Sequence, residues 1–227
     1  FLLFNRRHPG ARYLAVFVFV LAYNGFETFN WSAQLDKYIL FFDLFPFIVI
    51  FALGPALYLY VNSVLFPERK LQGKTVLWFF APFAFQAFVR VLLVGYVFLI
   101  LFNVVDERVG ANWLLDWYAR YSEPFSIIVF LGFLIASVIS HRKYRRTLGN
   151  RPREAQRIAG RWIGALLFFM VILGVAWPVT VIVPAFLDVD GGAYYYPIEL
   201  GLVLFIYWIA MTGYHRTRVI FNNNRKP

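Results

Sequence analysis

The chain has 227 residues, of which 61% are hydrophobic, 21% aromatic and only 15% charged. A soluble domain averages about a quarter charged residues and under half apolar ones, so this composition excludes a single soluble core and favours a bilayer as solvent. The absence of cysteine excludes disulfides and thiolate metal sites. The net charge of +10 lies in short loops between apolar runs, which does not fit a basic nucleic-acid-binding module.

Six segments are long and apolar enough to be membrane-spanning helices, which need about 20 mostly apolar residues. In chain order they cover about 11–30, 38–62, 75–104, 123–140, 162–187 and 195–214. Residues 1–4 are apolar and stand against the basic turn 5–8, which we interpret as the stub of a truncated span. The expected fold class is all-α, a polytopic transmembrane bundle of six complete spans plus that stub, seven in the intact module. The bundle occupies residues 1–221, and 222–227 form a cytoplasmic tail or the start of a linker.

Two segments between the spans also carry predictions. In 112–121, Trp113, Trp117 and Tyr121 recur four residues apart, which favours a short interfacial helix on the outer surface. The basic stretch 141–161 is interpreted either as a helical extension on anionic headgroups or as charge that only sets topology. The prolines within spans predict kinks or packing notches; they are Pro46, Pro55, Pro82, Pro178 and Pro184.

The distribution of Lys and Arg predicts the orientation of the bundle. Alternate loops hold eighteen of the 22 basic residues, whereas the opposite loops hold three and Arg90 lies inside a span. Because cytoplasmic loops are enriched in Lys and Arg, the first set is predicted to be cytoplasmic, and the C-terminus with it. The expected localisation is the cytoplasmic membrane, in a multi-pass arrangement.

Arg90 is the residue that points most directly to a binding site. An arginine within a span is costly unless it is paired or hydrated. At 1.5 Å per residue it lies about 20 Å from the inner face, in the outer leaflet. The predicted polar site therefore joins Arg90 to acids at similar depth and to an amide one turn away: Asp43, Glu199, Glu27 and Gln86. It would bind a small polar or anionic ligand; the alternative is a buried ion pair or an arginine that snorkels outward.

The sequence supports neither a cofactor nor an enzyme. The five lysines lie in loops or at helix ends, where no retinal Schiff base would form, and the three histidines lie at the cytoplasmic boundary. No metal ligands cluster, and no serine or threonine has a base at motif spacing. We therefore expect no catalytic residues, no metal and no cofactor.

Several short segments carry a resemblance to a known family. The second predicted span contains Gly-Pro-Ala-Leu-Tyr-Leu-Tyr-Val at 54–61, followed by Phe-Pro-Glu-Arg-Lys at 66–70. The third span opens with Trp-Phe-Phe-Ala-Pro-Phe at 78–83, and the last contains Tyr-Trp-Ile-Ala-Met-Thr-Gly-Tyr at 207–214. Together these resemble the N-terminal seven-helix membrane-sensing region of bacterial AraC-type (helix-turn-helix) transcriptional regulators.

The resemblance implies a sensor in the inner membrane of a bacterium that relays an extracellular, periplasmic or membrane cue to a cytoplasmic DNA-binding output. The implied partners are the lipid bilayer and a small ligand, with DNA only through an output domain absent from this chain. Because helix-turn-helix outputs usually act on paired half-sites, a homodimer is compatible with it. The alternative function is transport of a small solute, although no repeat between the two halves supports it.

Overall fold

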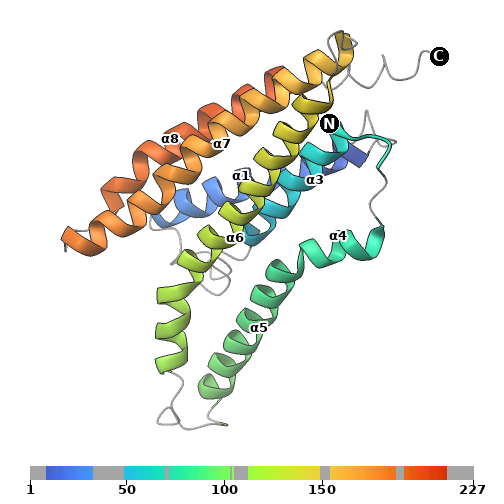
Figure 1. The fold of residues 1–227 in the computed structure, drawn as a ribbon. Coiled ribbons are helices and arrows are strands. Elements are labelled where there is room, and N and C mark those ends of the chain that lie inside the picture. The colour runs from blue at the N-terminus through green and yellow to red at the C-terminus, as the bar shows by residue number, and fades with distance from the viewer. Residues whose placement is uncertain are drawn as a thin grey trace.

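The computed structural model describes residues 9–32, 49–69, 72–102, 104, 112–148, 154–187 and 192–213. Its regular elements, over these residues, are all helical: α1 (Pro9–Ser32), the 3₁₀ turn η2 (Val49–Ala52), α3 (Leu53–Leu65), α4 (Gly73–Phe79), α5 (Ala81–Leu101), α6 (Asn112–Thr147), α7 (Glu154–Leu187), α8 (Gly192–Trp208) and the π-helical turn η3 (Ile209–Gly213). Figure 1 shows α7 and α8 side by side, α6 crossing next to α3, and α4–α5 at the edge of the bundle, where α5 contacts η2. The expected all-α class is confirmed.

Three helices are long and apolar enough to cross a membrane. Their apolar stretches are Ala81–Ile100 in α5, Arg120–Thr147 in α6 and Gln156–Thr180 in α7. Val49–Leu65 and Leu200–Thr212 are apolar but shorter. The first half of the second predicted span lies outside the described residues.

The third predicted span is two helices rather than one. The break falls at Phe80, whose backbone (φ −89°, ψ 5°) leaves the α-helical region between α4 and α5. Pro82 follows in the first turn of α5. A proline inside a helix has no N–H and its ring clashes with the carbonyl four residues back, so the helix restarts at the position where proline is tolerated. The kink expected at Pro82 is thus a full interruption.

The predicted separate interfacial helix at 112–121 is wrong, because these residues begin α6 and continue through Pro124 to Thr147. No glycine separates the two parts, and the Ser126 hydroxyl donates to the Glu123 carbonyl at 2.7 Å beside the proline. Local side-chain bonds of this kind let apolar helices pass through proline. The shared face is nevertheless confirmed, since Trp113, Trp117 and Tyr121 are all exposed.

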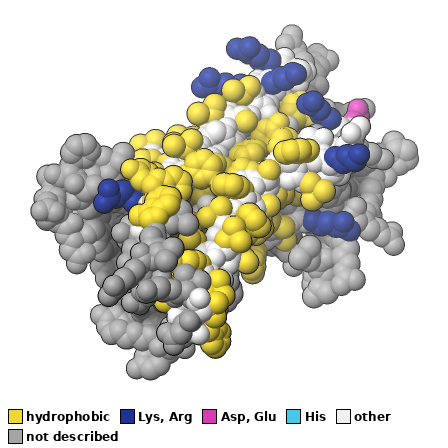
Figure 2. All heavy atoms as spheres, turned by 90° about the horizontal axis from the view of Figure 1, so that it is seen from below, with side chains coloured by type: hydrophobic (Ala, Val, Ile, Leu, Met, Phe, Trp, Pro, Cys, Tyr) yellow, Lys and Arg dark blue, Asp and Glu magenta, His cyan; other side chains and the backbone are white. Residues whose placement is uncertain are grey.

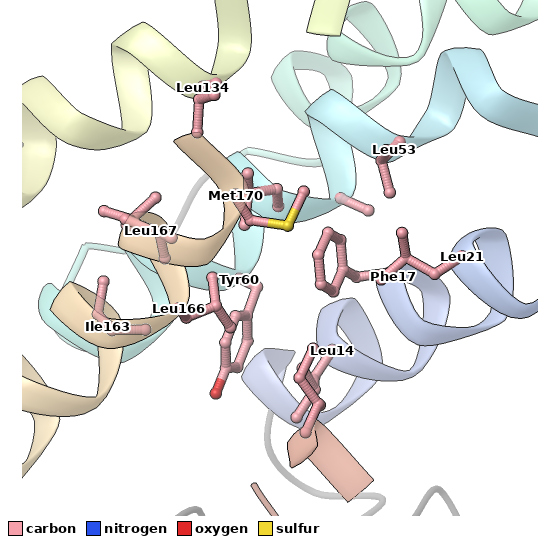
Figure 3. Packing of buried hydrophobic residues seen from close by; sticks show 14 of the residues in the cluster. Leu14, Phe17, Leu21, Leu53, Tyr60, Leu134, Ile163, Leu166, Leu167 and Met170 are labelled. Atoms are coloured by element: carbon pink, nitrogen blue, oxygen red, sulfur yellow. The ribbon is translucent and has the colours of Figure 1, made fainter. Parts of the chain in front are cut away.

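The buried core is built by α1, η2–α3, α6, α7 and α8–η3. Figure 3 shows Leu14, Phe17 and Leu21 of α1 meeting Leu53 and Tyr60 of α3 and a row of α7 side chains. That row consists of Ile163, Leu166, Leu167 and Met170. At its centre the indole nitrogen of Trp162 donates to the Tyr60 hydroxyl at 2.8 Å. The bond satisfies a buried donor that would otherwise destabilise the core.

Helices α4 and α5 add no residue to that buried cluster, and α4 has no buried residue at all. Phe79 attaches the end of α4 by edge contacts with Tyr58 of α3 and Phe133 of α6, at centroid distances of 5.3 and 5.9 Å. We call α4–α5 the arm. Phe80 and Phe83 pack against the edge of the buried cluster, and α5 also contacts η2. The polar contacts of α5, described next, add to this attachment.

Candidate functional site

The side chain of Tyr118, near the start of α6, is the point at which α5 meets α6. Gln86 donates from its amide nitrogen to the Tyr118 hydroxyl at 2.7 Å. Arg90 places its guanidinium carbon 5.1 Å from the centre of the Tyr118 ring, within the range of a cation–π contact. Because Gln86 and Arg90 are one helical turn apart, both reach the same partner.

The buried carboxyl group of Glu27 brings α1 into the same region. It is close enough to act on the Tyr118 hydroxyl electrostatically, although it belongs to a different helix. Tyr118 precedes the apolar stretch of α6, which starts at Arg120. Burial is the main cause that raises the pKa of Tyr118, Glu27 adds to this, and Arg90 and the Gln86 hydrogen bond oppose it. We call Glu27, Gln86, Arg90 and Tyr118 the polar cluster.

Asn30 lies one turn after Glu27 on α1 and is fully buried. Neither its amide nitrogen nor its amide oxygen has a hydrogen-bond partner within the part of the chain that the structure describes. A buried amide without partners is unusual, because leaving it unsatisfied is unfavourable by about 1–3 kcal/mol per group. The C-terminal end of α1 therefore holds a donor and an acceptor that a water molecule or a polar ligand would satisfy.

Three of the five residues predicted for the site are brought together, namely Arg90, Gln86 and Glu27. Asp43 lies outside the described residues, and so does the side chain of Glu199. That the three bind a ligand stays a prediction.

Sequence reasoning missed Tyr118, which is the centre of the cluster. The prediction assigned residues 112–121 to the surface because of their exposed aromatic face. A signal was present, since Tyr118, Ser122 and Ser126 recur four residues apart and are all buried. This second stripe points inward beside the exposed one.

A further contact that the sequence did not predict joins α6 to α7. The indole nitrogen of Trp177 donates to a Glu123 carboxyl oxygen at 3.1 Å. The contact gives a half-buried carboxylate a partner on the neighbouring helix.

The polar cluster offers groups that can bind and orient a polar molecule. It presents a cation, a phenol, an amide and the carboxyl group of Glu27. Over the described ranges, no three His, Cys, Asp or Glu residues gather as metal ligands. The imidazole Nε2 of His141 lies 2.9 Å from the Gly160 carbonyl oxygen, which joins α6 to α7.

The chain was compared with protein-family models, with curated proteins and with solved structures. None of the three comparisons gives a match. The resemblance to the sensing region of AraC-type regulators therefore stays a prediction from the sequence.

Proposed function

We propose that the chain is a membrane-embedded signal-sensing module whose polar cluster binds a small polar or anionic ligand. One observation carries the proposal: an arginine in the apolar stretch of α5 and a buried amide converge on one tyrosine where two helices meet. Ionisable residues in a membrane are costly, and they typically mark ligand or ion sites. A guanidinium is also the side chain best suited to carboxylates and phosphates.

The proposed mechanism is a change in how α5 is attached. A ligand shifts a conformational equilibrium only if it binds one arrangement better than the other. A ligand carboxylate or phosphate that takes over the Arg90 guanidinium would compete with the Tyr118 ring. Because α5 buries a smaller share of its apolar stretch than α6 or α7 over the described residues, the position of α5 relative to α6 is the element that such a ligand would bias.

The proposed output runs through α8, the last described helix. Trp208 of α8 stacks on Trp162 of α7 at 4.9 Å, and Phe205 of α8 meets Phe17 of α1 at 6.5 Å. Both contacts belong to the core that also holds α3 and α6. We propose that this packing relays the state of the bundle to a cytoplasmic DNA-binding domain. Reading the coding sequence past Pro227 tests that part, since a helix-turn-helix would support it and a stop codon would favour solute transport.

The proposed topology is six complete spans plus the stub of a seventh in a bacterial inner membrane. Three long apolar helices and the alternation of basic loops support it. The same rule puts the turn between α6 and α7 in the cytoplasm. A cysteine introduced at Arg145 should resist a membrane-impermeant maleimide in intact cells and react after lysis; labelling in intact cells would reverse the orientation.

The binding proposal is tested with the purified chain in detergent and a panel of succinate, citrate, inorganic phosphate and glycerol phosphate. We expect at least one to raise the melting temperature of the wild-type protein. Arg90→Gln should abolish that rise, whereas Arg120→Gln, an exposed arginine on α6, should keep it. A rise that survives Arg90→Gln in full would remove Arg90 from the site.

A further inference from the structure

Six cations are exposed at the end where α6 and α7 approach each other: Arg142, Lys143, Arg145, Arg146, Arg157 and Arg161. Glu154 is the one acid among the described residues from 141 to 161. We call this group the basic end. Figure 2 shows Lys and Arg side chains mainly along the upper and right-hand edges of a broad hydrophobic area, with a further one at its left.

The exposed stripe of α6 leads directly into this basic end. Ile128, Ile135 and Ile139 are 67%, 59% and 59% exposed and follow one another at helical spacing. Arg142 and Arg146 continue the same spacing. One face of one helix therefore changes from apolar to basic between residues 139 and 142.

Helix α7 makes the same change in the opposite chain direction. Arg157 and Arg161 come first, and Phe168, Ile172 and Val175 follow on the same exposed face. Here the change falls between residues 161 and 168.

Two hydrogen bonds between α6 and α7 set the axial register of one helix against the other. The His141 ring meets the Gly160 carbonyl at 2.9 Å, and the Tyr144 hydroxyl donates to the Gln156 carbonyl at 3.2 Å. Residue 141 of α6 is therefore level with residue 160 of α7. Arg161 lies beside the point where α6 becomes basic. The exposed faces of α6 and α7 therefore change between apolar and basic at the same level along the two helices.

We infer that this level is the boundary between the hydrocarbon and the headgroups, and that the basic end binds the headgroups of anionic phospholipids. A flat boundary between hydrocarbon and headgroups would end the apolar faces of two adjacent helices at the same level. Long basic side chains just beyond it reach the phosphate layer, and an anionic surface attracts them. The rigid pairing of α6 and α7 holds Arg142 and Arg161 at that layer together.

The test measures binding of the full chain to phosphatidylglycerol by native mass spectrometry and by the melting temperature in a neutral detergent. Phosphatidylcholine is the neutral lipid control, and inorganic phosphate and a DNA duplex are the other anions. We expect phosphatidylglycerol to bind tighter than phosphatidylcholine and to raise the melting temperature, and added salt to weaken the effect. Inorganic phosphate at equal concentration should not reproduce it.

A fourfold variant, Arg142→Gln, Arg146→Gln, Arg157→Gln and Arg161→Gln, should bind phosphatidylglycerol at least tenfold more weakly, since each cation near an anionic surface is worth about fivefold. Two single substitutions on α6 form a matched pair. Arg146→Gln should weaken binding of phosphatidylglycerol, whereas Arg120→Gln, at the other end of the helix, should leave it unchanged. If the fourfold variant does not fold, as judged by circular dichroism, the single pair decides the outcome. Equal binding of the two lipids, equal losses in the pair, or tighter binding of DNA than of phosphatidylglycerol would overturn the inference.

Discussion

The core helices and the arm are held in different ways. In the core, α1, α3, α6, α7 and α8 bury a continuous cluster of apolar side chains around Tyr60 and Trp162. The arm contributes nothing to that cluster, and only 17% of the apolar stretch of α5 is buried, against 28% for α6 and α7. It is attached by the Phe79 ring contacts, by Phe80 and Phe83 packing against the edge of the core, by contacts of α5 with η2 and by the polar cluster. A helix attached in this way is one whose position a small polar molecule can change, whereas the core would have to be repacked.

The largest expected loss of stability comes from a substitution in the core. Trp162→Ala removes a buried ring that stacks on Trp208 and bonds to Tyr60, and should lower the free energy of unfolding by about 3–5 kcal/mol. Trp78→Ala in α4 is the matched control, because that ring is 77% exposed. Chemical unfolding in detergent, followed by circular dichroism, measures both. Equal losses would contradict the distinction between core and arm.

A pair of glycines tests the same distinction with a single added methyl group. A Cβ at Gly54 of α3 would lie 3.0 Å from the Cβ of Phe133 and 3.3 Å from the backbone of Phe130 on α6, whereas a Cβ at Gly95 of α5 would meet nothing within 4 Å. Gly54→Ala should therefore destabilise by about 1–3 kcal/mol through overpacking. Gly95→Ala should be neutral or stabilising, since alanine favours a helix by about 1 kcal/mol over glycine. Thermal unfolding of the two variants side by side gives the answer, and a stabilising Gly54→Ala would show that α3 and α6 are not in close contact.

The smallest expected effect concerns the attachment of the arm. Tyr118→Phe keeps the ring beneath Arg90 but removes the acceptor for the buried Gln86 amide, at a cost of about 1 kcal/mol. Hydrogen exchange should rise in α5 and stay unchanged in α7. Tyr121→Phe, whose side chain is 48% exposed, is the control. Unchanged exchange in α5 would mean that the polar cluster does not fix the arm.

The sequence predicted the helical class because that class follows from composition. The cost of burying charge singled out Arg90, which the structure brings together with Gln86 and Glu27 around Tyr118. It predicted the separate surface helix wrongly, because nothing local shows whether a helix continues through Pro124. It missed Tyr118, since pairing between α5 and α6 depends on how the two helices cross, which periodicity within one segment does not encode. The break at Phe80 had a local signal in Pro82, but proline alone does not distinguish a kink from a new helix.

The turn η3 has a geometric consequence for whatever follows it. A π-helical turn holds more residues than an α-helical one, and the hydroxyl of Thr212 donates to the Trp208 carbonyl within it. Each residue of an α-helix advances the chain by about 100° around its axis. The last residues of η3 therefore lie at a different angle around the axis of α8 than an uninterrupted α-helix would give them. That angle is set next to the Trp162–Trp208 stack.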